Sequence, residues 1–75
     1  MSASIEHPQL TRVDVEELGQ GCENISRGFA WIATSPLLDY AAAGTFRHES
    51  REMRRMGRWL TDTLAPLFPG AEGEP

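Results

Sequence analysis

Arginine is the residue type with the most chemical potential in this chain, and most of its arginines occupy one short stretch. All seven basic residues are arginine, and five of them fall within twelve residues: Arg47, Arg51, Arg54, Arg55 and Arg58. On a helix, at about 100° per residue, these five side chains span an arc of about 100° on the side opposite the apolar residues of the same helix. A basic helical face of this kind binds phosphates, acidic proteins or membrane surfaces.

Three interpretations of this arginine face are open. The chain's own acids could neutralise it, because folding the chain about Ser35 brings Glu23 to the level of Arg47. The same fold brings Glu16 to the level of Arg54. The second interpretation is an acidic protein partner, and the third is nucleic acid. A net charge of −4 weighs against nucleic acid as the main partner.

Two tryptophans lie off the apolar pattern of the chain and each follows an arginine by four residues. This spacing lets the guanidinium of Arg27 lie over Trp31, and that of Arg55 over Trp59. Tryptophan and arginine are enriched at binding hot spots. The alternative is that a wider core or a dimer interface covers the indoles. The predicted partner-binding residues are Arg27, Trp31, Arg47, Arg51, Arg54, Arg55, Arg58 and Trp59.

Catalysis and metal binding have little support in the residue types. The histidines, His7 and His48, have no nucleophile and third orienting group at helical spacing. There is no glycine-rich phosphate loop and no His-x-x-x-His pair. Cys22 is the single cysteine, which excludes a disulfide within the chain and the usual zinc sites. We therefore expect no catalytic residues, no metal and no cofactor.

Two apolar stripes define the elements that must position these side chains. The first steps 3-4-3-4-3 through Val15, Leu18, Cys22, Ile25, Phe29 and Ile32. The second follows the turn signal Ser35-Pro36 and runs through Phe46, Met53, Met56, Leu60, Leu64 and Leu67. Such spacing places each set on one face of a helix. The pattern predicts an all-α antiparallel helical hairpin whose stripes face each other or a second copy of the chain.

The first helix is expected over residues 13–34. Thr11 and Asp14 resemble a capping box at its start. The alternative is Asp14 itself as the N-cap, with Glu16 and Glu17 in the first turn. Gly19, Gly21 and Gly28 interrupt the helix, and each costs up to about 1 kcal/mol relative to alanine. Three interpretations of these glycines are open. They are tolerated on the helix surface, or Gly21 and Gly28 allow a second helix to approach closely, or they break the helix, which would then begin near Cys22.

The second helix is expected to begin at Pro36, with Ser35 as its N-cap. It runs to about Ala65, where the following proline disfavours helix. A break at Gly44 is the alternative. Glu49 lies on the apolar side of this helix, where it would set a dimer register or occupy a solvated first turn.

The size of the chain favours self-association. Seventy-five residues make one domain at most, and a chain this short buries only about 60% of its unfolded surface. Without disulfides or metal, oligomerisation is the remaining way to stabilise it. We expect a flexible arm at 1–10, a hairpin domain at 11–68 that dimerises into a four-helix bundle, and a disordered tail at 69–75. The predicted core or dimer seam is Val15, Leu18, Cys22, Ile25, Phe29, Ile32, Met53, Met56, Leu60 and Leu64.

The expected function is that of a small non-catalytic protein-binding regulator, such as a phage or mobile-element inhibitor of a host bacterial protein. A nucleic-acid-binding regulator that uses the Arg47–Arg58 face and a structural subunit of a larger assembly are the alternatives. No apolar run approaches the ~20 residues needed to cross a membrane. The lone cysteine and the lack of a signal peptide indicate the cytoplasm.

Overall fold

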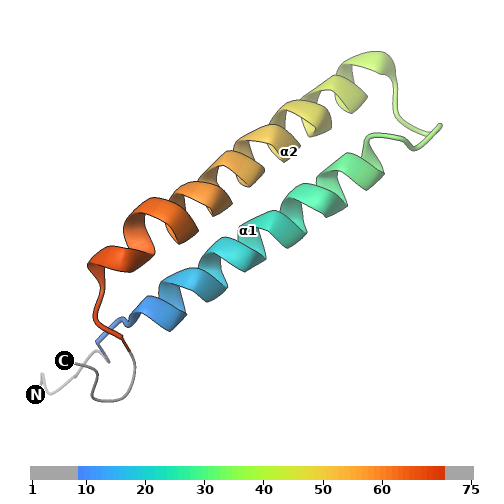
Figure 1. The fold of residues 1–75 in the computed structure, drawn as a ribbon. Helices are drawn as coiled ribbons and strands as arrows, with labels where there is room; N and C mark the ends of the chain where they lie inside the picture. The colour runs from blue at the N-terminus through green and yellow to red at the C-terminus, as the bar shows by residue number, and fades with distance from the viewer. Residues whose placement is uncertain (1–8, 71–75) are drawn as a thin grey trace, which may run out of the picture.

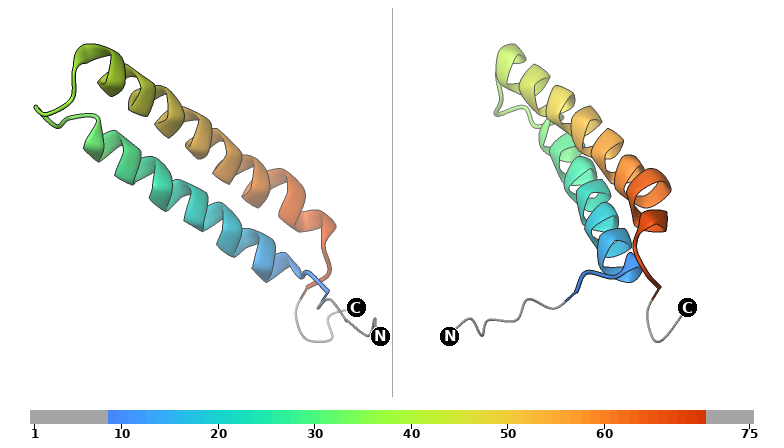
Figure 2. Two further views of the ribbon diagram at one scale, coloured as in Figure 1. Left: turned by 180° about the vertical axis from the view of Figure 1, so that it is seen from behind. Right: turned by 90° about the vertical axis from the view of Figure 1, so that its left-hand side faces the viewer.

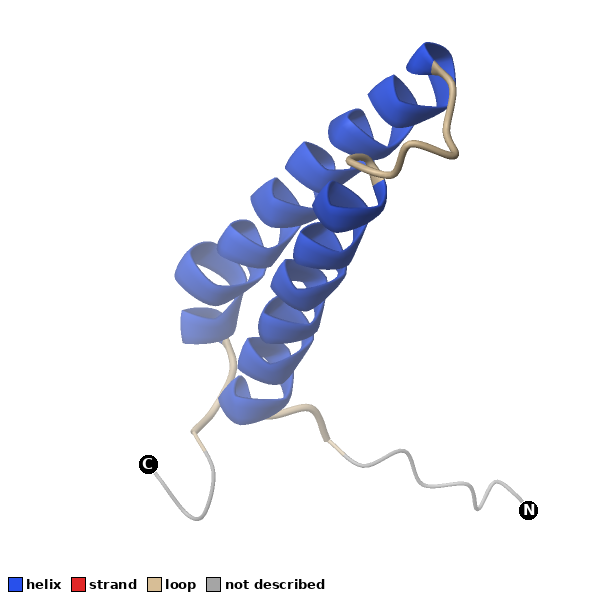
Figure 3. Cartoon of the chain, turned by 90° about the vertical axis from the view of Figure 1, so that its right-hand side faces the viewer, coloured by secondary structure: helices blue, strands red, loops and turns tan. Residues whose placement is uncertain are grey.

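The computed structural model describes residues 9–70, which form one antiparallel helical hairpin (Figure 1). Helix α1 spans Arg12–Ile32 and helix α2 spans Tyr40–Trp59. The chain extends α2 through a π-helical turn, η1 (Leu60–Leu64), and a 3₁₀ turn, η2 (Ala65–Leu67). Helices and loops, without strands, make up this part of the chain (Figure 3). The predicted all-α hairpin is confirmed, whereas most of the predicted arm and tail, residues 1–8 and 71–75, lies outside the described residues.

The start of α1 agrees with its predicted capping box. The Thr11 hydroxyl accepts a hydrogen bond from the Asp14 N–H at 3.3 Å, and the Asp14 carboxylate accepts one from the Thr11 N–H at 2.9 Å. This reciprocal pair satisfies two backbone donors that the first turn leaves free. The helix then continues unbroken through its three glycines, so the predicted alternative of a break is wrong. A methyl group on Gly21 or Gly28 would meet nothing within 4 Å, and both are surface glycines.

The second helix begins four residues later than predicted. Asp39 is its N-cap and accepts a hydrogen bond from the Ala42 N–H at 2.7 Å. The Ser35 hydroxyl instead accepts from the Leu37 N–H at 3.1 Å, within the turn that links the helices. Both are good capping residues, and Asp39 is the one that caps α2. The helix passes through Gly44 without interruption, so a break at that point is also wrong.

The C-terminal end of the hairpin is shaped by Pro66. Proline has no N–H to donate to Asp62, four residues earlier, and its ring crowds that carbonyl. The helix widens into the π turn of η1, in which the Ala65 N–H donates to the Leu60 carbonyl, and then tightens into η2. Past this point the chain returns to the start of α1, where the Arg12 N–H donates to the Pro69 carbonyl at 2.8 Å. That hydrogen bond closes the open end of the hairpin.

Small residues form the seam between the two helices. Besides Val15 and Ala65, the buried residues are spaced by seven along each side of the hairpin: Gly19, Ser26 and Ala33 on the first, and Ala43, Ser50 and Gly57 on the second. A Cβ built on Gly57 would lie 2.8 Å from the Gly19 carbonyl oxygen. The two backbones are therefore in direct contact, which only glycine permits at this crossing.

A pair of serines occupies the middle of this seam. Ser26 Oγ donates to the Ser50 carbonyl at 2.7 Å, and Ser50 Oγ donates to the Ser26 carbonyl at 2.8 Å. Both side chains are buried, and each hydroxyl has the partner that burial requires. These reciprocal bonds set the register, with Ser26 level with Ser50 and Gly19 level with Gly57.

The predicted apolar stripes lie mostly beside this seam rather than in it. Val15 is the one stripe member that is buried. Leu18, Ile25, Ile32, Met56 and Leu67 are exposed at 57%, 45%, 43%, 48% and 75%, and the remaining members are partly buried. The prediction that the stripes face each other within one chain is confirmed only in part: Phe29 and Phe46 meet across the helix pair, whereas most of the large side chains project outward because small residues hold the helices close along the seam. The other alternative, that the stripes face a second copy, stays a prediction.

Candidate functional site

The close-packed seam divides the hairpin into two broad faces. At about 100° per residue, the stripe of α1 projects to one side of the line through Gly19 and Ser26. In an antiparallel pair, the stripe of α2 projects to the same side. The Phe29 and Phe46 rings confirm this, because their centroids lie 5.6 Å apart across the helix pair. We call this side the apolar face; its members are Leu18, Cys22, Ile25, Phe29, Ile32, Phe46, Met53, Met56, Leu60 and Leu64.

The apolar face is uncovered in the described part of the chain. Figure 2 shows the two helices as a single layer from behind and from the side. Glu49 also projects to this side, at the same angle from the seam as Ile25, and is exposed. It sits nine residues into α2, so the interpretation that it occupies the first turn of the helix is wrong. Cys22 is a partly buried free thiol near the seam.

The opposite side carries the arginines. Helical geometry places Arg47, Arg51, Arg54 and Arg58 of α2 on this side, at a spacing of 4-3-4, and Arg27 of α1 across from them. We call this side the arginine face. This is the side, opposite the apolar stripe, on which the sequence predicts the α2 arginines. The structure adds that Arg27 shares their face.

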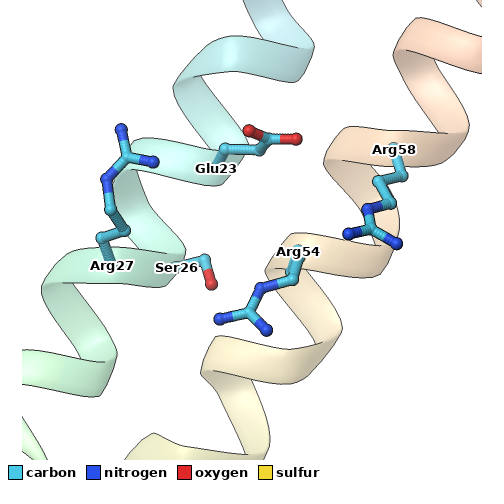
Figure 4. A pocket seen from close by; sticks show the side chains of 5 residues that line it. All are labelled: Glu23, Ser26, Arg27, Arg54 and Arg58. Carbon is cyan, nitrogen blue, oxygen red and sulfur yellow. The ribbon is translucent and has the colours of Figure 1, made fainter.

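The arginine face is hollowed along the line between the helices. One hollow of about 300 Å³ is lined by Glu23, Ser26, Arg27, Arg54 and Arg58 (Figure 4). The next, of about 370 Å³, is lined by Ala30, Ala33, Thr34, Arg47, Ser50, Arg51 and Arg54. Arg54 lines both, so the two hollows adjoin at this side chain and follow the same line between the helices. Their floor consists of the small seam residues, and their wall on α2 is arginine; we call the two together the arginine groove.

The acids of the chain leave most of this charge unneutralised. Among residues 9–70 the one ion pair joins Arg55 to Glu52, at 3.1 Å, and both side chains are largely exposed. An exposed pair of this kind contributes about 0–1 kcal/mol. Arg27 donates to the Asn24 side-chain oxygen. Arg47, Arg51, Arg54 and Arg58 have no ion pair within the described chain.

The register explains why the predicted pairing with α1 does not form. Because α2 begins at Tyr40, Glu23 lies level with Met53, and Glu16 lies level with Leu60. The predicted levels, Glu23 with Arg47 and Glu16 with Arg54, are wrong. Glu23 does line the arginine groove, but it makes no ion pair there. The interpretation that the hairpin neutralises its own arginines therefore loses its main support.

Exposed aromatic rings gather near the loop end of the hairpin. Trp31 is 79% exposed and Tyr40 is 87% exposed. The one cation–π contact of the described chain places the Arg47 guanidinium 6.0 Å from the Tyr40 ring centroid. The predicted stacking of Arg27 on Trp31 and of Arg55 on Trp59 is not formed. Sequence reasoning missed Tyr40, although its position seven residues before Arg47 extends the arginine row by one heptad.

Other chemistries find no support in residues 9–70. No three histidine, cysteine or acidic side chains gather there as metal ligands would. His48 is exposed on α2, with no nucleophile bonded to it. Neither helix of this part combines the length and apolar character that spanning a bilayer requires. No protein-family model, curated protein or solved structure matches the chain, so its function is argued from its own residues.

Proposed function

We propose that this chain is a small non-catalytic regulator that acts through protein–protein contacts, as a homodimer. The observation that carries the proposal is the uncovered apolar face. Large aliphatic and aromatic side chains from both helices lie side by side on it, while the seam within the hairpin consists mainly of glycine, alanine and serine, with Val15 as its one large aliphatic residue. Contiguous exposed apolar surface of this kind marks an interaction site.

A second copy is the occupant that we propose for the apolar face. Two hairpins joined by these faces form a four-helix bundle, with helices packed at about 20°. Such a dimer supplies the hydrophobic core of large residues that the single hairpin lacks. It also leaves the arginine face of each copy directed outward, where it is free to contact another protein.

The exposed side chains allow a rough estimate of dimer stability. Full burial of a leucine, isoleucine or methionine is worth about 1.5–3 kcal/mol, so each half-exposed member retains about 1 kcal/mol to gain. Four such residues per copy, Leu18, Ile25, Ile32 and Met56, amount to about 8 kcal/mol for the pair. Association costs about 4–15 kcal/mol. These four residues alone therefore do not outweigh the cost of association, and the proposed dimer also requires further burial of Phe29, Met53 and Leu60, which are partly buried in the hairpin.

Sedimentation equilibrium tests this proposal with a matched pair of variants. Ile25→Glu places a charge at the centre of the apolar face and should yield a monomer. Gln20→Glu makes the same change in net charge on an exposed position of the same helix, away from that face, and should remain dimeric. A wild-type monomer at concentrations up to about 100 µM, where a micromolar dimer would be well populated, contradicts the proposal.

The regulated partner, in this proposal, contacts the arginine face. Arg47, Arg51, Arg54 and Arg58 lack counter-ions within the described chain, and an acidic protein surface would supply them. An inhibitor of a host bacterial protein, encoded by a phage or mobile element and acting in the cytoplasm, is the biological setting that we propose.

The same unpaired arginines favour a second candidate function, a nucleic-acid-binding regulator. Binding that rests on phosphate contacts weakens steeply as salt is raised. A titration of duplex DNA at two salt concentrations separates this candidate from the first. A third setting, a subunit of a larger assembly, would cover the apolar face with a different chain and leave the isolated protein monomeric.

A further inference from the structure

We infer that the arginine groove binds an acidic α-helix of a protein partner, laid along the line between α1 and α2. This inference rests on the proposed protein-binding function and names the partner's chemistry. Three features of the groove carry it: the spacing of the arginines, the small floor, and the mixed charge at one end.

The spacing of the arginines matches a helix. Arg47, Arg51, Arg54 and Arg58 follow one another at intervals of 4-3-4, which keeps them in one row over about 16 Å. A partner helix that carries aspartate or glutamate at the same 3-4 spacing presents a parallel row of carboxylates. Each guanidinium can then meet one carboxylate in a charge-assisted hydrogen bond.

The floor of the groove allows such a helix to approach closely. Ser26, Ala30, Ala33 and Ser50 line it, and none of them projects beyond a methyl or hydroxyl group. Small side chains on the floor let the ridge of a third helix settle between the first two. Tyr40, with its exposed ring beside Arg47, extends the row at the loop end and offers an aromatic anchor.

The charge pattern favours a helix over a nucleic-acid strand. Glu23 lines the groove together with Arg54 and Arg58, so a continuous line of phosphates would meet a carboxylate there. A helix can place a neutral or basic residue opposite Glu23 and acids on either side. The net charge of −4 adds long-range repulsion against a polyanion, whereas it matters less for a short helix with few charges.

Adjacent arginines provide a matched test. Arg54 lines both hollows of the groove, whereas Arg55 lines neither and is paired with Glu52. Arg55 borders only a separate hollow among the arginines of α2, which no residue of α1 lines. Arg54→Glu and Arg55→Glu make the same change in net charge on neighbouring exposed residues of one helix. The probe is an alanine-based helical peptide with glutamates at 4-3-4 spacing, titrated by fluorescence anisotropy. A second peptide has the same composition, with its glutamates distributed around the helix.

We expect the patterned peptide to bind the full-length wild type, and Arg54→Glu to weaken binding by about tenfold or more, or 1.4 kcal/mol. Arg55→Glu should change the affinity by less than about threefold, and the redistributed peptide should bind at least about fivefold more weakly. Circular dichroism checks that both variants stay folded.

Equal losses in the two variants, or equal binding of the two peptides, would overturn the inference by showing only general attraction between charges. Tighter binding of a 20-base-pair duplex than of the patterned peptide, with a steep salt dependence, would also overturn it. These outcomes are separate from the dimer test, because sedimentation of Ile25→Glu reports on the apolar face alone. A wild-type dimer that does not bind the patterned peptide removes this inference and leaves self-association standing.

Discussion

Replacing Gly57 by alanine adds one methyl group at the point where α1 and α2 come closest. Without a neighbour, this change would stabilise a helix by up to about 1 kcal/mol. Here the new Cβ would lie 2.8 Å from the Gly19 carbonyl oxygen and 3.3 Å from the Cys22 Cβ. The clash is with the backbone of the facing helix, which cannot rotate away as a flexible side chain can.

The structure gives the size of the effect. Ordinary van der Waals contact begins near 3.4 Å, so the helices must separate locally by roughly half an ångström. Overpacking of this kind costs about 1–3 kcal/mol, and the movement also stretches the nearby hydrogen bonds of Ser26 and Ser50. After the gain in helix propensity, we expect Gly57→Ala to lower the free energy of unfolding by about 1–2 kcal/mol.

The control is the same substitution at a glycine that faces nothing. Gly21→Ala meets no atom within 4 Å and should raise the free energy of unfolding by up to about 1 kcal/mol. In thermal melts followed by circular dichroism, at one fixed protein concentration, each kcal/mol corresponds to about 4–8 °C. The two variants should therefore shift the midpoint in opposite directions. If both raise it equally, the backbones are not in contact and the small-residue seam is refuted.

Two further predictions concern hydrogen bonds that the structure describes. Ser26→Ala should lower the free energy of unfolding by only about 1 kcal/mol, because the Ser50 hydroxyl still donates to the Ser26 carbonyl. Adding Ser50→Ala should lower it by about as much again, as measured by urea denaturation. A double variant as stable as the wild type would show that the serine pair does not hold the register. Thr11→Ala removes the N-cap of α1 and should lower the free energy of unfolding by about 0.5–2 kcal/mol. Thr45→Ala is the control, because the Thr45 hydroxyl donates only to the Ala41 carbonyl on the exposed face of α2, and it should change the melting temperature little. Equal shifts of the melting temperature in the two variants would contradict the capping role.

The elements that local sequence determines were predicted well. Hydrophobic periodicity identified two helices, and Thr11 with Asp14 marked the start of the first, because a capping box needs only neighbours three residues apart. The arginines were placed on the side opposite the apolar stripe for the same reason, since helical geometry alone sets that relation. The predicted start of α2 at Pro36 was wrong because Ser35 and Asp39 are both good N-caps, and Asp39 is the one that caps the helix. Local preference alone does not rank two such caps.

The sequence by itself determined which residues share a face, but the tertiary structure decided which face lies inside. The signal for the seam was present as two heptad repeats of small residues, through Ser26 and through Ser50, yet small residues carry little hydrophobic weight and do not stand out in an apolar pattern. These residues matter because their side chains are short, which lets the backbones of α1 and α2 touch and lets each serine hydroxyl reach a carbonyl of the other helix. Once the helices meet on that line, the large apolar side chains and the arginines are left on opposite surfaces. Helical periodicity reports which side chains project together, whereas contact between helices depends on shape and register across the whole pair.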